Sequence, residues 1–259
     1  MMRKAAFGAL AAAFALTALL AAPRGLSAAG EGIAIPEQEW SFHGIFGYYD
    51  RAAAQRGLQV YREVCSGCHS LDYIAFRNLA DLGYSEDEIK AFSAQAMITD
   101  GPDNTGEMFE REGRASDYFP SPFPNAQAAA AANNGAAPPD LSLMAKARFG
   151  GADYIYALLT GYEEPPAGFE LLDGQNYNKY FSGHRIAMAQ PLYDDSVTYA
   201  DGTEASLEQM AHDVSVFLAW TAEPEMEQRK RAGIKVILFL IVLTGLFYAV
   251  KRKVWSDLH

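Results

Sequence analysis

The residues with the clearest chemical potential lie in one short stretch, Cys65-Ser66-Gly67-Cys68-His69. Two thiols three positions apart can each form a thioether with a vinyl group of the same porphyrin, and the histidine that follows can supply an axial imidazole to the iron. The chain has no other cysteine. The motif therefore predicts one covalently bound haem c, attached through Cys65 and Cys68, with His69 as an iron ligand.

Two other chemistries use paired cysteines, and the sequence favours neither. A structural zinc site needs two further Cys or His ligands at paired spacing. The remaining histidines are instead scattered singly along the chain, at His43, His184, His212 and His259. A redox-active cysteine pair needs no histidine after it and usually follows a strand in a βαβ unit.

A haem that transfers electrons usually has a second axial ligand, either a histidine or a methionine. Met188 is the favoured candidate because it lies in an extended stretch before Pro191, ahead of the last helix of the exported part. Met97 and Met210 lie in helical patterns, so both are expected to pack rather than to bind iron. Two alternatives stay open at this point, His184 and His212.

Two amphipathic helices are predicted to position the haem motif. Asp50 is a good N-cap for a helix that runs from about Arg51 into the motif. A second helix is predicted from Leu207 to about Thr221, and Ser206 begins a capping-box signature before it. Gly57 lowers the helix propensity of the first helix, which is expected if another helix crosses closely there.

The rest of the exported part is predicted to consist of short helices and long loops. Helices are predicted at 142–147 and 152–159, and the alanine-rich segment 126–137 is helical by propensity. Segments 99–124 and 161–205 are rich in Gly, Pro, Asp and Asn, so they are predicted to be loops in which short strand pairs could form. The predicted fold class is mainly α.

The two ends of the chain predict export and a membrane anchor. Residues 1–28 have a basic start, an apolar stretch and small residues at the end, which is the layout of a secretory signal peptide. Residues 232–250 carry one charge and, at about 1.5 Å per residue, are long enough to cross a bilayer core. Between them we expect an exported haem domain (29–224) and a short basic linker (225–231). Residues 251–259 are expected to form a tail on the opposite side of the membrane.

The exported part is strongly acidic. Residues 25–224 contain 11 basic and 29 acidic residues, a net charge of −18, whereas the whole chain has a net charge of −11. A domain of this charge excludes nucleic acid as a partner. It would attract a basic protein and speed its association in a salt-dependent way.

Several segments outside the haem motif are distinctive in combination. They are Phe46-Gly47-Tyr48-Tyr49-Asp50-Arg51, Pro138-Pro139-Asp140-Leu141-Ser142, Ala147-Arg148-Phe149-Gly150-Gly151, Leu158-Leu159-Thr160-Gly161-Tyr162, Met188-Ala189-Gln190-Pro191-Leu192 and Phe217-Leu218-Ala219-Trp220. Together with a single C-terminal anchor, they resemble the cytochrome c1 family, the haem subunits of cytochrome bc1 complexes. The resemblance covers nearly all of the chain after the signal peptide.

The resemblance implies a class I cytochrome c-like haem domain with long loops, in which Met188 is the second iron ligand. Arg148 is then expected to pair with a haem propionate, and Tyr154, Asn133 and Pro139 are expected to line the haem pocket. Some bacterial members hold the haem loop with an extra disulfide, for which this chain has no cysteine.

By resemblance, the chain is expected to be an electron-transfer subunit of a bacterial inner membrane and not an enzyme on its own. It would accept one electron from the Rieske iron–sulfur protein while cytochrome b oxidises quinol, and pass it to a soluble or membrane-bound, basic cytochrome c. The haem domain would lie in the periplasm and the C-terminus in the cytoplasm. The alternative is a free-standing, membrane-tethered electron shuttle, which would have a smaller haem domain and a long flexible linker.

Overall fold

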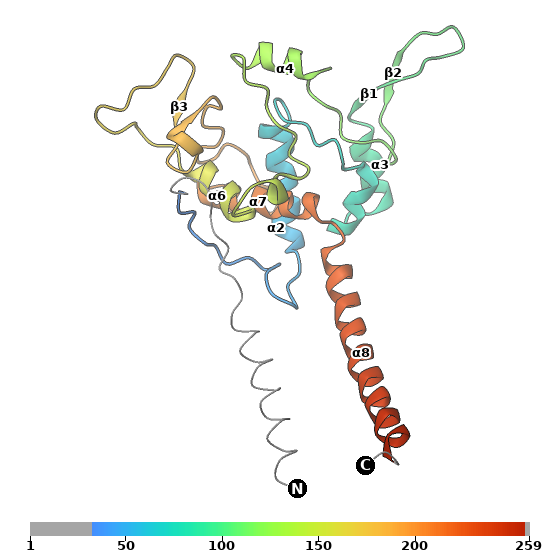
Figure 1. The fold of residues 1–259 in the computed structure, drawn as a ribbon. Coiled ribbons are helices and arrows are strands. Elements are labelled where there is room, and N and C mark those ends of the chain that lie inside the picture. The colour runs from blue at the N-terminus through green and yellow to red at the C-terminus, as the bar shows by residue number, and fades with distance from the viewer. Residues whose placement is uncertain (1–32, 257–259) are drawn as a thin grey trace. The chain divides into compact units, whose positions relative to one another are not determined.

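Most of the described chain is helical. The computed structural model describes residues 33–256, and from Ala34 onward these residues form one unit. Its α-helices are α2 (Arg51–Val60), α3 (Glu86–Ser93), α4 (Ala126–Ala132), α5 (Met144–Ala147), α6 (Ala152–Thr160), α7 (Leu207–Ala222) and α8 (Met226–Val254) (Figure 1). A π-helical turn (Tyr61–Cys65) and two 3₁₀ helices (Phe76–Leu82 and Ser182–His184) complete the helical elements of these residues. The prediction of a mainly α fold is confirmed.

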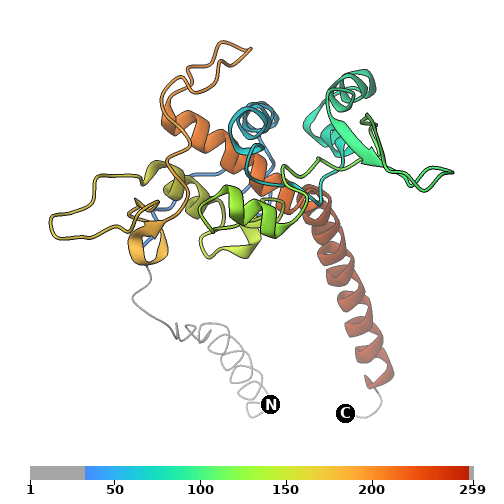
Figure 2. The ribbon, with the colours of Figure 1, turned by 90° about the horizontal axis from the view of Figure 1, so that it is seen from above.

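Helices α2 and α7 cross in close contact, and Figure 2 shows the blue α2 nearly end-on beside the orange α7. The crossing is at Gly57, where a Cβ atom would lie 2.1 Å from the carbonyl oxygen of Asp213 and 2.7 Å from Cβ of Phe217. No side chain fits in that space, so the glycine lets the two backbones touch. The predicted close crossing at Gly57 is therefore confirmed.

Both crossing helices begin where the sequence predicts. The Asp50 side chain accepts a hydrogen bond from the backbone N–H of Ala53, and the Ser206 side chain accepts one from Gln209. Met210 is 0% exposed, which confirms that it packs in the core. The largest fully buried side chains come mainly from these helices and the 3₁₀ helix after the haem motif: Leu58, Tyr61, Phe76, Phe217 and Trp220.

A buried ion pair fixes α2 against α7. Asp213 is fully buried, and the Arg56 guanidinium donates to both of its carboxylate oxygens, at 2.7 and 3.0 Å. Gln209 donates a further hydrogen bond at 3.0 Å. Burial alone would raise the pKa of Asp213, but hydrogen bonds from His212, Arg56 and Gln209 outweigh burial and hold it below its usual value. The carboxylate therefore stays charged at neutral pH.

Helix α3 is absent from the sequence prediction, although its start carries a clear signal. The Ser85 side chain accepts from the backbone of Glu88, and the Glu88 side chain accepts from the backbone of Ser85, which is a capping box. Helix α4 is shorter than the alanine-rich segment suggests. It ends at Ala132, and the chain turns at Asn134 and Gly135, which both have positive φ.

Two short antiparallel strand pairs form in the described residues. Strand β1 (Met97–Asp100) pairs with β2 (Phe109–Glu112), and β3 (Asn176–Tyr177) pairs with β4 (Arg185–Ile186). The second pair lies in a segment predicted to be a loop with possible strand pairs. The prediction that Met97 packs in a helix is wrong, because Met97 begins β1 and its side chain is 55% exposed.

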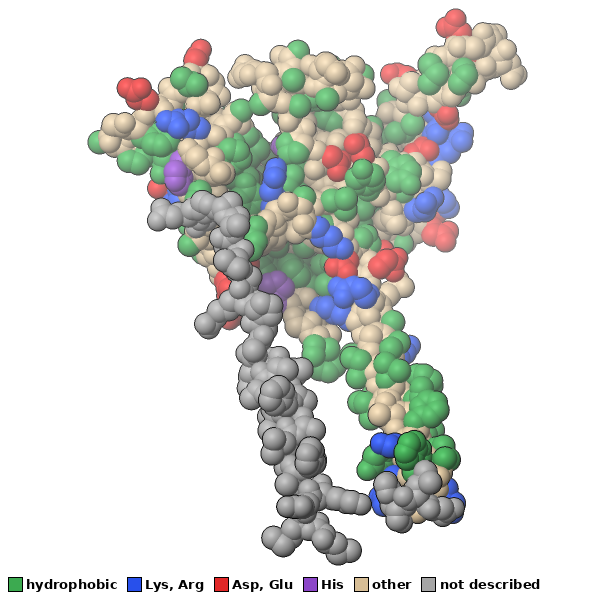
Figure 3. All heavy atoms as spheres, viewed as in Figure 1, with side chains coloured by type: hydrophobic (Ala, Val, Ile, Leu, Met, Phe, Trp, Pro, Cys, Tyr) green, Lys and Arg blue, Asp and Glu red, His purple; other side chains and the backbone are tan. Residues whose placement is uncertain are grey.

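Helix α8 is one continuous helix of 29 residues with an exposed apolar surface, seen as the green column in Figure 3. Its most apolar window has a mean hydropathy of 2.3, and it is long and apolar enough to cross a membrane. Residues 226–231, expected as a linker, form its first turns. The predicted signal peptide (1–28) and the end of the tail (257–259) lie outside the described residues.

Candidate haem site

The haem motif follows α2 directly and folds into a compact turn. Helix α2 widens into a π-helical turn that ends at Cys65, and π-helical turns are frequent at functional sites. The backbone N–H groups of Cys68 and His69 then both donate to the carbonyl of Cys65, at 3.1 and 2.9 Å. This turn brings the two sulfur-bearing residues and the histidine onto one short loop. Both cysteines are free thiols in the structure, with Cys65 half-buried and Cys68 exposed.

The environment of the Cys65 thiol differs from that of a redox-active cysteine. Burial, and to a smaller extent the neighbouring Cys68, raises the pKa of the Cys65 thiol to about 12. Redox-active cysteines instead have a lowered pKa. Residues 33–256 contain no group of three or more His, Cys, Asp or Glu side chains that could hold a metal ion. Thioether attachment of a haem through Cys65 and Cys68 stays the prediction.

His69 is held in the orientation that a metal ligand needs. Its Nδ1 atom lies 2.8 Å from the carbonyl oxygen of Pro139. Since a carbonyl can only accept, Nδ1 carries the hydrogen and Nε2 keeps a free lone pair for a metal. Burial lowers the pKa of His69 below its usual value and outweighs the opposing hydrogen bond to Pro139, so the ring is neutral at pH 7.

The segment that carries Pro139 is itself bound to the residues after the haem motif. The backbone N–H of Leu141 donates to the carbonyl of Ser70 at 3.0 Å. The Asp140 carboxylate accepts from the Ser70 hydroxyl and from the backbone N–H of Asp72, both at 2.8 Å. These bonds fix the position of the Pro139 carbonyl, and through it the imidazole of His69.

Met188 lies in a loop whose backbone is held on one side by two polar side chains. Its carbonyl accepts a hydrogen bond from the Tyr162 hydroxyl at 3.1 Å and one from the Asn176 amide at 3.3 Å. The Met188 side chain is half-buried. Neither Tyr162 nor Asn176 has a role in the sequence prediction, although Tyr162 belongs to one of the distinctive segments.

The two histidine alternatives to Met188 are engaged elsewhere. The His184 ring stacks on Tyr177 with 5.6 Å between centroids, and its Nδ1 lies 3.3 Å from the Asn178 carbonyl oxygen. The His212 ring stacks on Trp40 at 5.1 Å, and its Nδ1 lies 3.3 Å from the Asp213 carboxylate. These contacts hold Nδ1 and one ring face of each histidine, and Met188 stays the predicted second ligand.

The other predicted pocket residues fall into different places. Arg148 is exposed and directly follows α5, and its charge acts on the phenol of Tyr154 in α6. Burial raises the pKa of Tyr154, and Tyr154 in turn lies close enough to influence Tyr162. Tyr162, on which Tyr154 acts electrostatically, is the residue whose hydroxyl binds the Met188 carbonyl. The Asn133 amide instead donates to Ala129 within its own helix, at 2.8 Å.

These residues fit a covalently bound haem. The chain offers two unpaired sulfurs three positions apart, a neutral imidazole with a free Nε2, and a thioether on a loop held by its backbone. Two apolar side chains close to Arg148 in the sequence are exposed, Leu143 at 45% and Phe149 at 97%. A porphyrin would need apolar surfaces of this kind to cover its faces.

Comparison with known proteins gives a consistent result. Residues 40–258 match the model of the Cytochrome C1 family. The chain is 50% identical over 242 residues to cytochrome c1 of Rhodospirillum rubrum, a match that covers 87% of this chain and 89% of that protein. It is 50% identical over 228 residues to "Cytochrome c1, heme protein, mitochondrial" of Schizosaccharomyces pombe, covering 88% of this chain and 74% of that protein.

A third relative is longer than this chain. Cytochrome b/c1 of Bradyrhizobium diazoefficiens is 54% identical over 246 residues, which are 86% of this chain but 36% of that protein. This chain therefore spans about a third of its length. The family match covers most of the chain and includes the haem motif, the Pro139 segment and the Met188 loop. The chain belongs to the cytochrome c1 family.

Proposed function

We propose that this chain is the membrane-anchored haem subunit of a cytochrome bc1-type quinol–cytochrome c oxidoreductase. In this role it accepts one electron from a Rieske iron–sulfur protein, beside a quinol-oxidising cytochrome b, and passes it to a cytochrome c. It is an electron-transfer component and not an enzyme on its own. The observation that carries the proposal is the Pro139–His69 hydrogen bond directly after a Cys65/Cys68 motif, in a chain of the cytochrome c1 family.

Each site residue has a defined task in this proposal. Cys65 and Cys68 would attach one haem c through thioethers, and His69 and Met188 would bind its iron. When bound, the haem supplies a one-electron iron couple, and a thioether ligand raises its potential. Pro139 and Tyr162 position the two ligands, the first through its carbonyl and the second through its hydroxyl. Because His69 and Met188 would both bind the iron, we expect the haem to transfer electrons and not to bind oxygen or peroxide.

Arg148, Tyr154 and Asn133 have less direct tasks. The exposed guanidinium of Arg148 is suited to pair with a haem propionate, because it has no carboxylate partner among the ion pairs of the described residues. Tyr154 lies beside it and lines the same side of the pocket. Asn133, whose side-chain amide donates to the Ala129 carbonyl of α4, would contribute packing at the pocket edge.

Export and anchoring complete the proposal. Residues 1–28 act as the signal peptide, the haem domain extends to residue 224 in the periplasm, and the apolar part of α8 (232–250) crosses the inner membrane. Residues 251–259 then lie in the cytoplasm. The acidic exported domain steers a basic cytochrome c toward the haem, and contacts of modest area let it leave quickly.

A free-standing, tethered electron shuttle is the second candidate, and the structure of the connection to α8 speaks against it. Only three residues lie between the end of α7 at Ala222 and the start of α8 at Met226. The Arg51 guanidinium also binds the Glu227 carboxylate of α8 at 2.6 Å. A tethered shuttle needs a long flexible linker, whereas this connection is short and braced.

Purification of the tagged chain in mild detergent tests the proposal. The expected result is co-purification of b-type haem, seen in a reduced-minus-oxidised spectrum, together with inhibitor-sensitive, quinol-driven reduction of cytochrome c. A c-type spectrum without b haem or quinol activity would instead identify a free-standing carrier. Absence of haem staining on the denatured chain would exclude covalent attachment and would rule out both the bc1 subunit and the tethered shuttle.

A further inference from the structure

A short loop before α2 exposes apolar side chains beside the start of α8. The side chains of Ile45, Phe46 and Tyr48 are 70%, 84% and 62% exposed. In Figure 1 the blue segment that contains them reaches down alongside the first turns of α8. Figure 3 shows green, hydrophobic atoms at this lowest point of the domain. We define residues 43–48 as the apolar loop.

The apolar loop is rigidly built, so its exposure does not come from a lack of structure. The backbone N–H of His43 donates to Trp40, that of Gly47 to Gly44, and that of Tyr48 to Ser41, at 3.0, 3.3 and 3.0 Å. A Cβ atom on Gly47 would lie 2.1 Å from the His43 carbonyl oxygen, so this tight path requires glycine. The fold therefore presents Ile45 and Phe46 at the tip of a defined turn.

The residues at the base of the apolar loop hold it to the core. Trp40, Phe42 and Tyr49 are 5%, 9% and 3% exposed. The Phe42 ring stacks on Trp40 at 5.5 Å and packs against Tyr49 at 5.4 Å between centroids. Apolar side chains at the base are thus buried, whereas those at the tip are exposed. An exposed apolar tip of this kind predicts that another apolar surface or medium covers it.

The point at which the apolar loop is attached to α8 sets the distance of the loop from the proposed membrane span. The Lys230 ammonium in the second turn of α8 donates to the carbonyl oxygens of Phe42 and Gly47, at 2.7 and 3.3 Å. Lys230 comes two residues before Ala232, where the apolar segment begins, a rise of about 3 Å along the helix axis. The apolar loop is therefore tied to α8 at the level where lipid headgroups begin.

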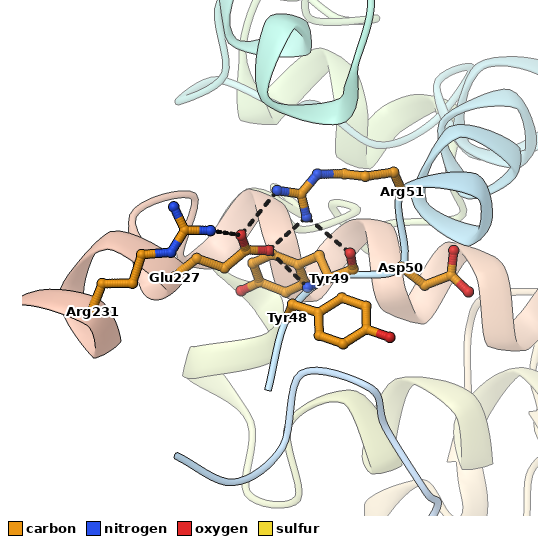
Figure 4. A pocket seen from close by; sticks show the side chains of 6 residues that line it. All are labelled: Tyr48, Tyr49, Asp50, Arg51, Glu227 and Arg231. Atoms are coloured by element: carbon orange, nitrogen blue, oxygen red, sulfur yellow. Dashed lines mark hydrogen bonds and ion pairs between the residues drawn. The ribbon is translucent and has the colours of Figure 1, made fainter. Parts of the chain in front are cut away.

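A second set of contacts joins the residues after the apolar loop to the first turns of α8. Figure 4 shows Glu227 between Arg51 and Arg231, with the backbone N–H of Tyr49 directed at the same carboxylate. The Glu227 oxygens lie 2.6 Å from Arg51, 3.5 Å from Arg231 and 2.9 Å from the Tyr49 nitrogen. Tyr48 lies beside this cluster and lines the same pocket (Figure 4).

We propose that the apolar loop is an interfacial membrane anchor, in which Ile45 and Phe46 insert among the lipids beside α8 and Tyr48 lies at headgroup level. Aromatic side chains are enriched at this depth, and basic residues such as Lys230 and Arg231 suit the adjacent phosphate layer. The domain would then have two points of contact with the bilayer. The inference rests on the proposed function, because it requires that α8 spans the membrane.

Spin-label accessibility in the full, haem-loaded chain tests the inference. Phe46→Cys, the deep reference Leu240→Cys in α8, and the control Leu172→Cys would each be labelled and reconstituted into phospholipid nanodiscs. Leu172 is a matched control because it is 70% exposed but lies in the loop between α6 and β3, away from α8 in Figure 1. The wild-type chain, whose two cysteines are blocked by thioethers, sets the labelling background.

The expected result is a graded accessibility to lipid-soluble oxygen relative to a water-soluble nickel chelate. This ratio should be highest at Leu240→Cys, intermediate at Phe46→Cys and lowest at Leu172→Cys. Equal ratios at positions 46 and 172, with position 240 still deep, would overturn the loop anchor and leave the proposed function intact. Nickel access at position 240 would instead refute the membrane span. Shielding of position 46 from both reagents would mean that protein covers the loop, which also overturns the inference.

Discussion

Substitution of the glycine at the helix crossing gives the sharpest test of the fold that holds the haem motif. In Gly57→Ala, the new methyl group would lie 2.1 Å from the Asp213 carbonyl oxygen, whereas ordinary contact begins near 3.4 Å. The two helices would have to separate by about 1.3 Å at a point where backbone meets backbone. Replacing glycine in a free helix would stabilise it by about 1 kcal/mol, but overpacking of a tight contact costs about 1–3 kcal/mol or more.

We therefore expect Gly57→Ala to lower the free energy of unfolding by about 2 kcal/mol. A contact this short places the overpacking cost at the upper end of its range, and the gain in helix propensity offsets part of it. Urea unfolding of the haem-loaded chain in detergent, followed by haem absorbance, measures this change. Gly233→Ala is the matched control, since Gly233 is also helical but has nothing within 4 Å of its added Cβ. If Gly57→Ala were as stable as this control or more stable, the close crossing of α2 and α7 would be refuted.

Three further predictions concern the ligand, the buried charge and the partner. Met188→Leu should keep the haem covalently attached but lower the midpoint potential by more than about 59 mV, a tenfold change in a one-electron equilibrium; an unchanged potential in a redox titration would mean that another residue binds the iron. Because its hydrogen bonds lower the pKa of Asp213 in the folded state, Asp213 stabilises the fold above its unfolded pKa of about 3.9, and this stability is lost as the pH falls through the lower folded pKa. Acid unfolding of Asp213→Asn should be flatter over that range, and an identical pH profile would contradict this assignment. Electron transfer to a basic cytochrome c should slow as ionic strength rises from about 0.01 to 0.15 M, since the screening length falls from about 30 to 8 Å; stopped-flow rates that do not change would exclude electrostatic steering.

Much of the helical frame could be predicted because its signals are local. The N-caps at Asp50 and Ser206, the apolar periodicity of α2 and α7, and the cost of a glycine at position 57 all lie within a few residues of the elements they specify. The same kind of signal exists at Ser85, where a capping box starts α3. That helix is missed because it is short, with eight residues of which four are charged, so few positions remain to show an apolar pattern.

The supports of the candidate site could not be predicted, since they join residues far apart in the sequence. The Pro139 carbonyl reaches His69 across 70 positions, and Tyr162 reaches the Met188 carbonyl across 26. Both use groups without a distinctive pattern, a backbone carbonyl and a tyrosine hydroxyl. The error at Met97 has a similar cause, because its strand exists only through pairing with Glu112 and its neighbours.

The widened turn at Tyr61–Cys65 determines which changes of chain length the helix can absorb before the haem motif. A π-helical turn holds one more residue than the α-helical turn it replaces, so it behaves as an insertion that the helix has absorbed without a gap. Each residue of an α-helix turns the chain by about 100° about its axis. Deleting one residue between Tyr61 and Val64 would return this turn to an ordinary α-helical turn, and the haem motif would keep nearly its present direction around α2. The spacing between Gly57 and Cys65 therefore already contains one extra residue, which the helix can lose at this turn, whereas the loss of further residues would rotate the haem motif about the axis of α2 by about 100° each.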